Sequence, residues 1–382
     1  MRRILALLLL GMSCIAAAAA AGMEEDESVE TVLERLTLRE KVGQLFVIRP
    51  EALCGELSAA ELNETYGHGA VSVTSDMRDR YAQYPCGGFA LFAKNIENPD
   101  QLLAFTEEMH ALGNVRPVLC IDEEGGRVAR LGNHEAFDVP RVLPMGTIRK
   151  TGNPEKAYEA GRRIGEYLRI YGLDVDFAPV ADVNTNPRNP VIGDRAFGSE
   201  PETASAFVIR YLDGLHDAGI AGCLKHFPGH GDTATDTHTG YAETQKTWEE
   251  LDACEMIPFR AGIGAGAEMV MTAHIAAPKV TGGELPSTLS YTVLTEKLRG
   301  ELGFEGVIIT DALSMGAVTE QFSSGEASVR AFLAGADILL MPYDYPEAFE
   351  AVLAAVERGE ITQERLDASV LRILRMKEAF VR

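Results

Sequence analysis

Short apolar segments alternate along the chain with longer segments in which apolar residues recur at helical spacing. Eight apolar segments have the length of a strand, at residues 42–48, 88–92, 117–121, 175–180, 221–224, 269–273, 306–310 and 336–341. Helical spacing occurs at residues 100–112, 155–171, 203–218, 247–264 and 353–382. Strands that are apolar throughout are typical of parallel sheets buried on both faces. The alternation predicts an α/β fold, a (β/α)8 TIM-type barrel that forms a single domain over residues 29–382.

The connection between the first two strands is longer than one helix requires. Residues 51–83 are therefore expected to contain an insertion. After the eighth strand the chain continues as a helical segment at residues 353–382, with no linker of low complexity and no sign of a second domain.

The first 21 residues differ from the rest of the chain. Arg2 and Arg3 precede an apolar run at residues 4–10, and small residues follow at 16–21. This order is typical of a secretory signal peptide. Two alternatives stay open, lipidation at Cys14 and retention of residues 4–21 as an anchor, since 18 residues are marginal for a membrane span. We expect an extracytoplasmic protein, secreted or associated with the cell envelope.

Charge and cysteine content narrow the classes of partner. The formal net charge of -22 disfavours nucleic acid and anionic membranes as partners, so membrane contact is expected only through an N-terminal anchor. The chain is expected to be a monomer. Beyond Cys14, five cysteines at long spacings form neither a disulfide framework nor a zinc signature, although a Cys54–Cys86 pair stays open.

Polar residues gather directly after five successive predicted strands. They are Asp122, Asp182, Arg195, Lys225, His226, His274 and Asp311. A single polar residue at a strand end is easily explained as a helix cap. Because the carboxyl ends of barrel strands build active sites, the repeated placement instead indicates one shared site.

The densest group of ionisable residues lies in a loop rich in glycine at residues 225–238. Its ionisable members are Lys225, His226, His230, Asp232, Asp236 and His238. Asp236 is two residues before His238, so a turn can place its carboxylate on one ring nitrogen while the other transfers a proton. Two alternatives stay open: a loop held by its own hydrogen bonds, and a metal site, although the spacing matches no known metal motif.

Two further strand ends carry acids. Asp311 ends an apolar strand, where a carboxylate can attack an anomeric carbon and form a glycosyl-enzyme, or simply cap a helix. In residues 121–130, a Gly125-Gly126 turn exposes acids and arginines suited to binding sugar hydroxyls. The alternative there is a structural network that joins Glu123 and Glu124 to Arg127.

These segments resemble the β-N-acetylglucosaminidases of glycoside hydrolase family 3. The resemblance covers most of the chain, through residues 36–45, 88–96, 189–195, 225–238, 271–274 and the Asp311 segment. The loop at 225–238 is the specific part. Family 3 β-glucosidases share its Lys-His opening but lack the Pro-Gly-His-Gly-Asp continuation and the Asp-x-His.

The resemblance implies a role for each matching position. Asp311 corresponds to the nucleophile, His238 to the acid/base and Asp236 to the residue that orients it. The positions that bind the sugar ring correspond to Asp122, Arg130, Arg195, Lys225 and His226. The implied mechanism is retaining double displacement without a metal or other cofactor, with an imidazole in place of the usual second carboxylate.

Two departures from the family pattern affect the loop. Thr237 stands where the family usually has Ser, and Tyr241-Ala242 replace a frequent Leu-Pro. The expected function is exo-acting removal of β-linked N-acetylglucosamine from oligosaccharides or muropeptides, meaning chitin oligosaccharides or peptidoglycan fragments. Alternatives are a β-glucosidase or β-xylosidase, a phosphorolytic enzyme, a metal-dependent hydrolase, and a sugar-binding wall protein without catalysis.

Overall fold

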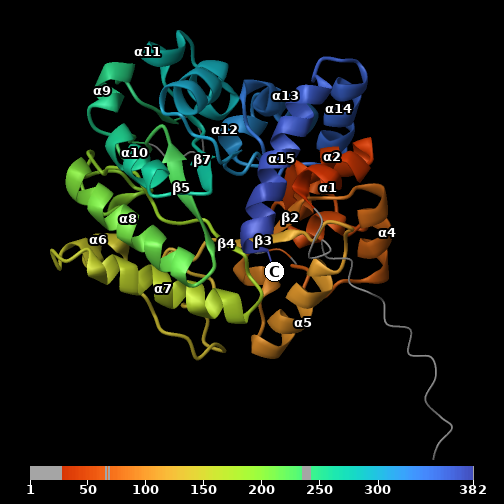
Figure 1. Ribbon diagram of the computed structural model, residues 1–382, viewed down its shortest axis with the longest axis horizontal. Coiled ribbons are helices and arrows are strands. Elements are labelled where there is room, and N and C mark those ends of the chain that lie inside the picture. The colour runs from red at the N-terminus through yellow and green to blue at the C-terminus, as the bar shows by residue number, and fades with distance from the viewer. Residues whose placement is uncertain (1–27, 65–66, 68, 235–241, 382) are drawn as a thin grey trace, which may run out of the picture.

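The computed structural model describes residues 28–64, 67, 69–234 and 242–381. Its centre is a barrel of parallel strands in the order β10-β1-β2-β3-β4-β5-β7-β9 (Figure 1). The strands are β1 (Phe46–Ile48), β2 (Gly88–Leu91), β3 (Val118–Ile121), β4 (Val175–Asp176), β5 (Ala221–Phe227), β7 (Met269–Thr272), β9 (Val307–Ile309) and β10 (Leu339–Leu340). A parallel bridge between Ile309 and Ile338 joins the last two strands and closes the barrel. The predicted (β/α)8 fold is confirmed.

Helices surround the barrel (Figure 1). The longer ones are α1 (Val29–Arg35), α2 (Leu38–Gln44), α4 (Ser75–Gln83), α5 (Pro99–His110), α7 (Glu155–Ile170), α8 (Pro201–Asp217), α10 (Met256–Gly264), α13 (Ser324–Ala334), α14 (Tyr345–Glu357), α15 (Gln363–Phe380) and the π-helix η5 (Thr292–Glu301). The shorter ones are α3 (Ala59–Leu62), α6 (Met145–Arg149), α9 (Trp248–Asp252), α11 (Pro278–Thr281), α12 (Gly316–Thr319), η1 (Pro50–Leu53), η2 (Ala93–Asn95), η3 (Gly193–Arg195) and η4 (Ser287–Leu289). A separate parallel pair, β6 (Ala242–Glu243) and β8 (Ile275–Ala276), lies beyond the ends of β5 and β7.

Several predicted boundaries were wrong. The predicted strand at 42–48 begins only at Phe46, because Thr37 and Glu40 form a capping box that starts α2 and carries it through Gln44. The predicted helix at 247–264 is two helices, α9 and α10, and the segment at 353–382 contains the end of α14 and all of α15. In the other direction, β5 extends past residue 224 to Phe227. Cys54 and Cys86 are free thiols.

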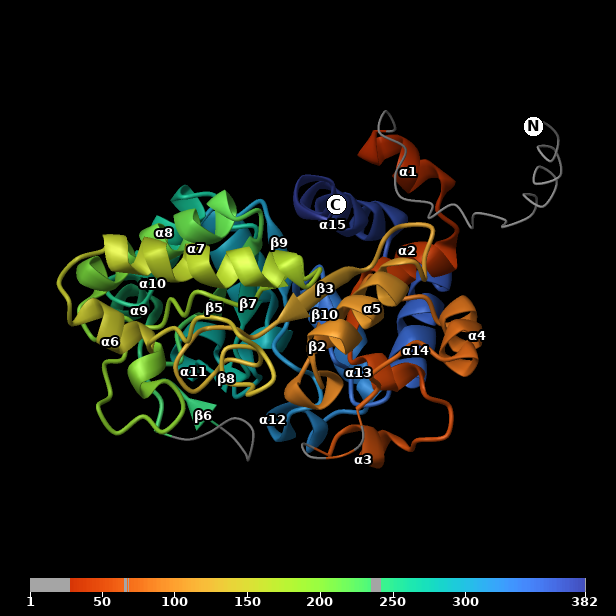
Figure 2. The same ribbon diagram turned by 90° about the horizontal axis from the view of Figure 1, so that it is seen from below.

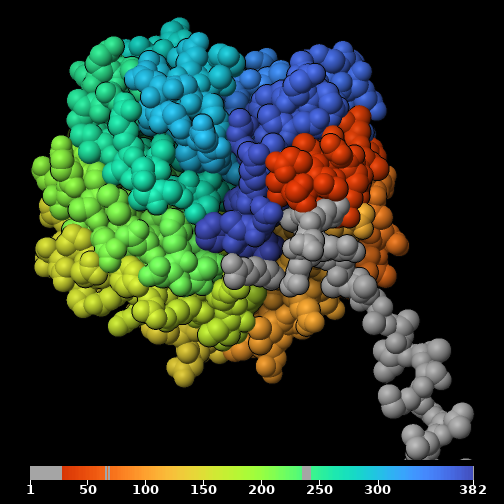
Figure 3. Space-filling model, in the orientation of Figure 1, coloured from red at the N-terminus to blue at the C-terminus, as the bar shows by residue number. Residues whose placement is uncertain are grey.

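The two faces of the barrel differ in what covers them. Figure 2 shows α1 and α15 together on one side and α3, α12 and β6 on the opposite side. On the first side, the Nζ of Lys377 in α15 donates to Gln44 Oε1 and to the Gly87 carbonyl, both at 2.7 Å, where β1 and β2 begin. The N-terminal and C-terminal helices pack side by side there (Figure 3), joined by an ion pair between Arg375 and Glu30.

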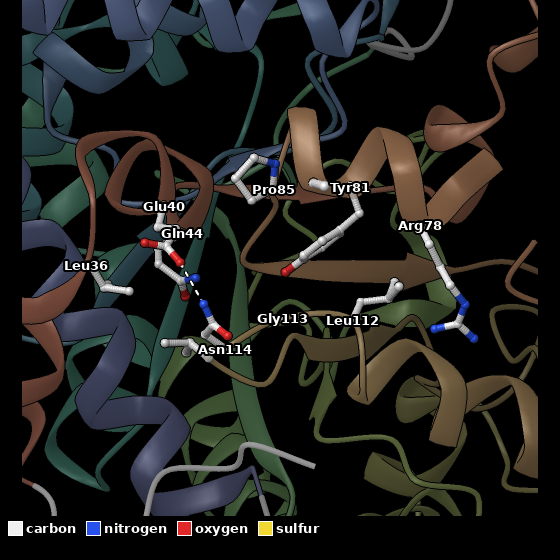
Figure 4. Close-up of a pocket in the computed structure, with 11 residues that line it drawn as sticks. Leu36, Glu40, Gln44, Arg78, Tyr81, Pro85, Leu112, Gly113 and Asn114 are labelled. Atoms are coloured by element: carbon white, nitrogen blue, oxygen red, sulfur yellow. Dashed lines mark hydrogen bonds between the residues drawn. The ribbon is translucent and has the colours of Figure 1, made fainter. Parts of the chain in front are cut away.

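A hollow of about 280 Å³ opens at the same end of the barrel (Figure 4). Residues just ahead of β1, β2 and β3 line it, namely Gln44, Pro85 and Val115. Asn114 donates across it to Glu40 at 3.0 Å. The hollow is therefore remote from the carboxyl ends of the strands, where the predicted site residues lie. Among the described helices, none is both long and apolar enough to cross a membrane.

Candidate active site

Asp122 and Lys225 meet at the carboxyl end of the barrel. Asp122 follows β3, and Lys225 projects from the last part of β5, where it is almost fully buried. The Lys225 ammonium lies 2.7 Å from Asp122 Oδ1, and Arg130 contacts the other carboxylate oxygen at 3.3 Å. Burial alone would raise the pKa of Asp122, but Lys225 and Arg130 outweigh it and hold this pKa well below its usual range. Asp122 is therefore an ionised acceptor.

Glu124 extends this cluster to Arg195. Its two oxygens accept hydrogen bonds from Arg195 Nε at 2.8 Å and Nη2 at 2.7 Å, a bidentate pair. Lys225 Nζ lies 2.6 Å from the same carboxylate. Burial would lower the pKa of Lys225, yet the Asp122 and Glu124 carboxylates raise it above its ordinary value. Two carboxylates thus share three cations in a site largely shielded from water.

His226 is oriented by a buried acid from the neighbouring strand. Asp182 Oδ2 lies 2.7 Å from His226 Nδ1, and the backbone N–H groups of His226 and His230 also donate to this carboxylate. Burial, the largest single influence, would raise the pKa of Asp182, but the charges and hydrogen bonds of His226 and His230 together outweigh it and lower this pKa. Because an ionised carboxylate only accepts, Nδ1 of His226 carries a hydrogen and Nε2 is left to face other groups.

Asp311 lies two residues after the end of β9, at the same end of the barrel. The Ala312 N–H donates to Asp311 Oδ1 at 2.7 Å. Burial, followed by the charge of His226, lowers the pKa of His230, while the charges of Asp182 and Asp311 oppose this shift. The electrostatic influence of Asp311 therefore reaches the His226–His230 loop.

The loop after β5 is described as far as Ala234. Asn189 donates to the His230 carbonyl at 2.8 Å, and the Thr233 hydroxyl lies 2.7 Å from His230 Nδ1. A Cβ at Gly231 would lie 1.9 Å from the Val183 carbonyl oxygen, so this close approach requires glycine. Asp236 and His238 lie outside the described residues, and their roles stay predictions.

Metal binding was one alternative for this loop. Within the part of the chain that the structure describes, no three histidine, cysteine or acidic side chains gather as ligands. His226 and His230 both direct Nδ1 to protein groups, Asp182 and Thr233 respectively.

Comparison with known proteins identifies the family. The pattern described as glycosyl hydrolase family 3 N terminal domain matches residues 37–376. The chain belongs to glycosyl hydrolase family 3. A "Beta-hexosaminidase A" from Pseudoalteromonas piscicida is 32% identical, and the match covers 90% of this chain and 61% of that protein. A "Beta-hexosaminidase" from Stenotrophomonas maltophilia is 35% identical, with 76% and 86% covered.

A solved structure supports the same assignment. The family 3 beta-N-acetylglucosaminidase from Paenibacillus sp. str. FPU-7 is 38% identical with a TM-score of 0.81, covering 90% of this chain and 62% of that one. The chain therefore spans about three fifths of the length of that enzyme and of the Pseudoalteromonas relative.

In this family 3 chain, Glu123 has a role that the sequence did not reveal. Its buried carboxylate accepts backbone N–H groups of Arg130, Leu131 and Gly132 at 2.5, 2.9 and 2.7 Å, and the Tyr167 hydroxyl at 2.8 Å. Glu123 thus fixes the loop that carries Arg130. The alternative of a network that joins Glu123 and Glu124 to Arg127 is not what the structure has: Glu124 pairs with Arg195, and the largely exposed Arg127 lies 3.8 Å from Asp194.

Phe92 was also missed. The Arg130 guanidinium lies 5.4 Å from the centre of its ring, which places the cation between an aromatic face and the Asp122 carboxylate. An aromatic residue at the carboxyl end of the second predicted strand was the available signal.

Proposed function

We propose that the chain is an exo-acting, retaining β-N-acetylglucosaminidase that removes terminal β-linked N-acetylglucosamine. The observation that carries the proposal is the convergence of Asp122, Lys225 and Asp311 from three strands at one end of the barrel. The resemblance of residues 225–238 to the Asp-x-His loop, and the relatives named hexosaminidases, support N-acetylglucosamine as the sugar.

The charged cluster suits recognition of sugar hydroxyls. Lys225 has three N–H donors, and two of them face Asp122 and Glu124, so one remains to donate to a hydroxyl. The ionised Asp122 can accept from hydroxyls at the same time. We assign Asp122, Arg130, Arg195, Lys225 and His226 to binding of the terminal sugar, where fixed partners reduce the reorganisation that binding requires.

Catalysis follows double displacement. A carboxylate oxygen of Asp311 attacks the anomeric carbon as the glycosidic bond breaks, and His238, oriented by Asp236, protonates the departing oxygen. The imidazole then takes a proton from water, and that water releases the sugar from Asp311 with the original β configuration.

We propose that the natural substrates are peptidoglycan fragments or chitin oligosaccharides. A signal peptide at residues 1–21, followed by the catalytic domain at 29–382, would bring a monomeric enzyme to such substrates outside the cytoplasm.

The test compares wild type, Asp311→Asn and His238→Ala in the release of nitrophenol from nitrophenyl β-N-acetylglucosaminide. We expect Asp311→Asn to be inactive and His238→Ala to retain activity mainly on good leaving groups. Preference for the β-glucoside or β-xyloside would support the alternative family activity, and a sugar phosphate formed in phosphate buffer would indicate phosphorolysis. A wild type that binds N-acetylglucosamine without hydrolysing any of these substrates would overturn the catalytic roles.

A further inference from the structure

His274 lies two residues after the end of β7 and is almost fully buried. Its Nε2 lies 2.9 Å from the carbonyl oxygen of Ala312. Because a carbonyl oxygen only accepts, Nε2 carries a hydrogen and donates it to Ala312. The imidazole therefore bridges from β7 to the segment that follows β9.

Ala312 connects this bond to Asp311. Its carbonyl accepts from His274, while its own N–H donates to Asp311 Oδ1 at 2.7 Å. His274 thus holds Ala312 through its carbonyl, and Ala312 holds the Asp311 carboxylate through its N–H. The carbonyl and the N–H belong to adjacent peptide units that share the Ala312 Cα, so the bond from His274 restrains the position of the unit that holds Asp311.

A side chain is needed to connect β7 to the segment after β9, because the backbone pairing between the two strands ends before that segment. The parallel ladder between β7 and β9 ends at the pair Met271 and Ile309. On the other flank, backbone bonds continue to Leu313, whose N–H donates to the Leu340 carbonyl at 2.9 Å. Beyond Ile309 the β7 side has no further pairing in this ladder, and the imidazole of His274 supplies the connection.

The ring itself is fixed at its other nitrogen. Nδ1 lies 2.9 Å from the Thr288 hydroxyl, which also contacts the Ala273 carbonyl at 3.0 Å and the Thr272 hydroxyl at 2.8 Å. Thr288 and Thr272 are fully buried. Both ring nitrogens therefore engage protein groups, an arrangement suited to orientation.

We infer that His274 is a positioning residue for the nucleophile: it holds the Ala312 carbonyl and so restrains the adjacent peptide unit, whose N–H keeps the Asp311 carboxylate directed at the anomeric carbon. The inference rests on the proposed function of Asp311. Displacement of a reacting group by about 1 Å can reduce a rate by about 100-fold, so the loss of one orienting bond has a measurable effect.

Two amide variants test the inference as a matched pair. In His274→Gln the side-chain amide reaches the position of Nε2 and can still donate to Ala312. In His274→Asn the shorter amide reaches only the position of Nδ1, so the bond to Thr288 can persist while the bond to Ala312 is lost. Both variants bury a neutral amide of similar polarity.

The measurement is the rate at which Asp311 is labelled by an activated fluoroglycoside of N-acetylglucosamine that forms a long-lived glycosyl-enzyme, followed by intact mass and peptide mapping. We expect His274→Asn to be labelled about 10- to 100-fold more slowly than wild type, and His274→Gln within about 3-fold. The inhibition constant of free N-acetylglucosamine should be similar in all three proteins, which a general structural defect would not leave unchanged.

The outcomes separate this inference from the proposed function. A wild type that carries no label on Asp311 would reject Asp311 as the nucleophile. Labelling of wild-type Asp311, with Asn and Gln variants reacting equally fast or equally slowly, would reject His274 as its positioning residue. If His274→Asn fails to fold, Thr288→Val with His274→Gln replaces the pair, and labelling of both at the wild-type rate would likewise overturn the inference.

Discussion

Replacement of Lys225 by methionine removes the charge at the centre of the cluster that we propose binds the sugar. The Lys225 ammonium lies 2.7 Å from Asp122 and 2.6 Å from Glu124, and it is 1% exposed. Without it, two buried carboxylates face each other across an apolar side chain. Each keeps one arginine partner, Arg130 or Arg195, so the variant does not leave either acid wholly unpaired.

The size of the effect follows from these contacts. Removal of one partner from a buried ion pair costs about 3–5 kcal/mol, and the remaining arginines place Lys225→Met at about 3 kcal/mol. Loss of a charged donor to a sugar hydroxyl costs a further 1.5–3 kcal/mol of binding, or about 10- to 150-fold in kcat/KM. The pKa of Asp122 should also rise towards its ordinary range, because Lys225 is the main group that lowers it.

Lys377 provides a matched control at the opposite end of the barrel. It is 2% exposed and also has two partners, but these are the neutral oxygens of Gln44 and Gly87. Because burial disfavours the charged ammonium of Lys377, Lys377→Met should lower the free energy of unfolding by much less than Lys225→Met does and leave kcat/KM unchanged. Urea unfolding at pH 7 and nitrophenol release are measured for both variants. Equal losses of activity in the two, or an unaffected Lys225→Met, would refute the reasoning.

Three further predictions concern stability, pH and loop position. Three arginines surround the buried carboxylate of Asp337, so Asp337→Asn should lower the free energy of unfolding by about 3–5 kcal/mol and leave KM unchanged. Equal urea midpoints for the variant and wild type would contradict this prediction. Burial lowers the pKa of Lys377 to about 8 in the folded state, whereas its pKa in the unfolded state is about 10.5. Between these two pH values the unfolded state binds more protons than the folded state, so the free energy of unfolding rises with pH. Urea midpoints at pH 7.5 and 9.5 should show this rise in wild type and not in Lys377→Met. Glu123→Gln should lower kcat/KM by about 10-fold, because its amide cannot accept from all of the N–H groups that hold the Arg130 loop; Tyr167→Phe, which removes only the phenol, should have a smaller effect.

The sequence predicted the barrel because short, mostly apolar runs alternate with helical segments eight times. This alternation can still be recognised when the individual boundaries are wrong by a few residues. The boundary error at Val42 arose because the buried residues Val42, Gly43 and Gln44 end α2 only one residue before β1, with no proline or charged residue between the two elements. The Thr37–Glu40 capping box was the signal that separates the two elements.

The sequence predicted individual candidate residues of the site, but it did not predict which of these residues contact one another. Strand ends locate Asp122 and Lys225 at one mouth, since the parallel fold brings those ends together. That Glu124 holds Arg195, or that Glu123 holds a loop by its backbone, depends on side-chain directions and loop paths that periodicity does not encode. His274 was placed at its strand end, yet its contact with Ala312 required the register between β7 and β9.

The packing of α1 against α15 would also set the orientation of the protein if it were tethered by its N-terminus. Both helices cover the end of the barrel where the strands begin, opposite α3, α12 and β6 (Figure 2). An attachment just ahead of Val29 would therefore hold the protein by the end of the barrel where the strands begin. The mouth with Asp122 and Asp311 would then point away from the surface of attachment, towards fragments that diffuse in from the surrounding medium.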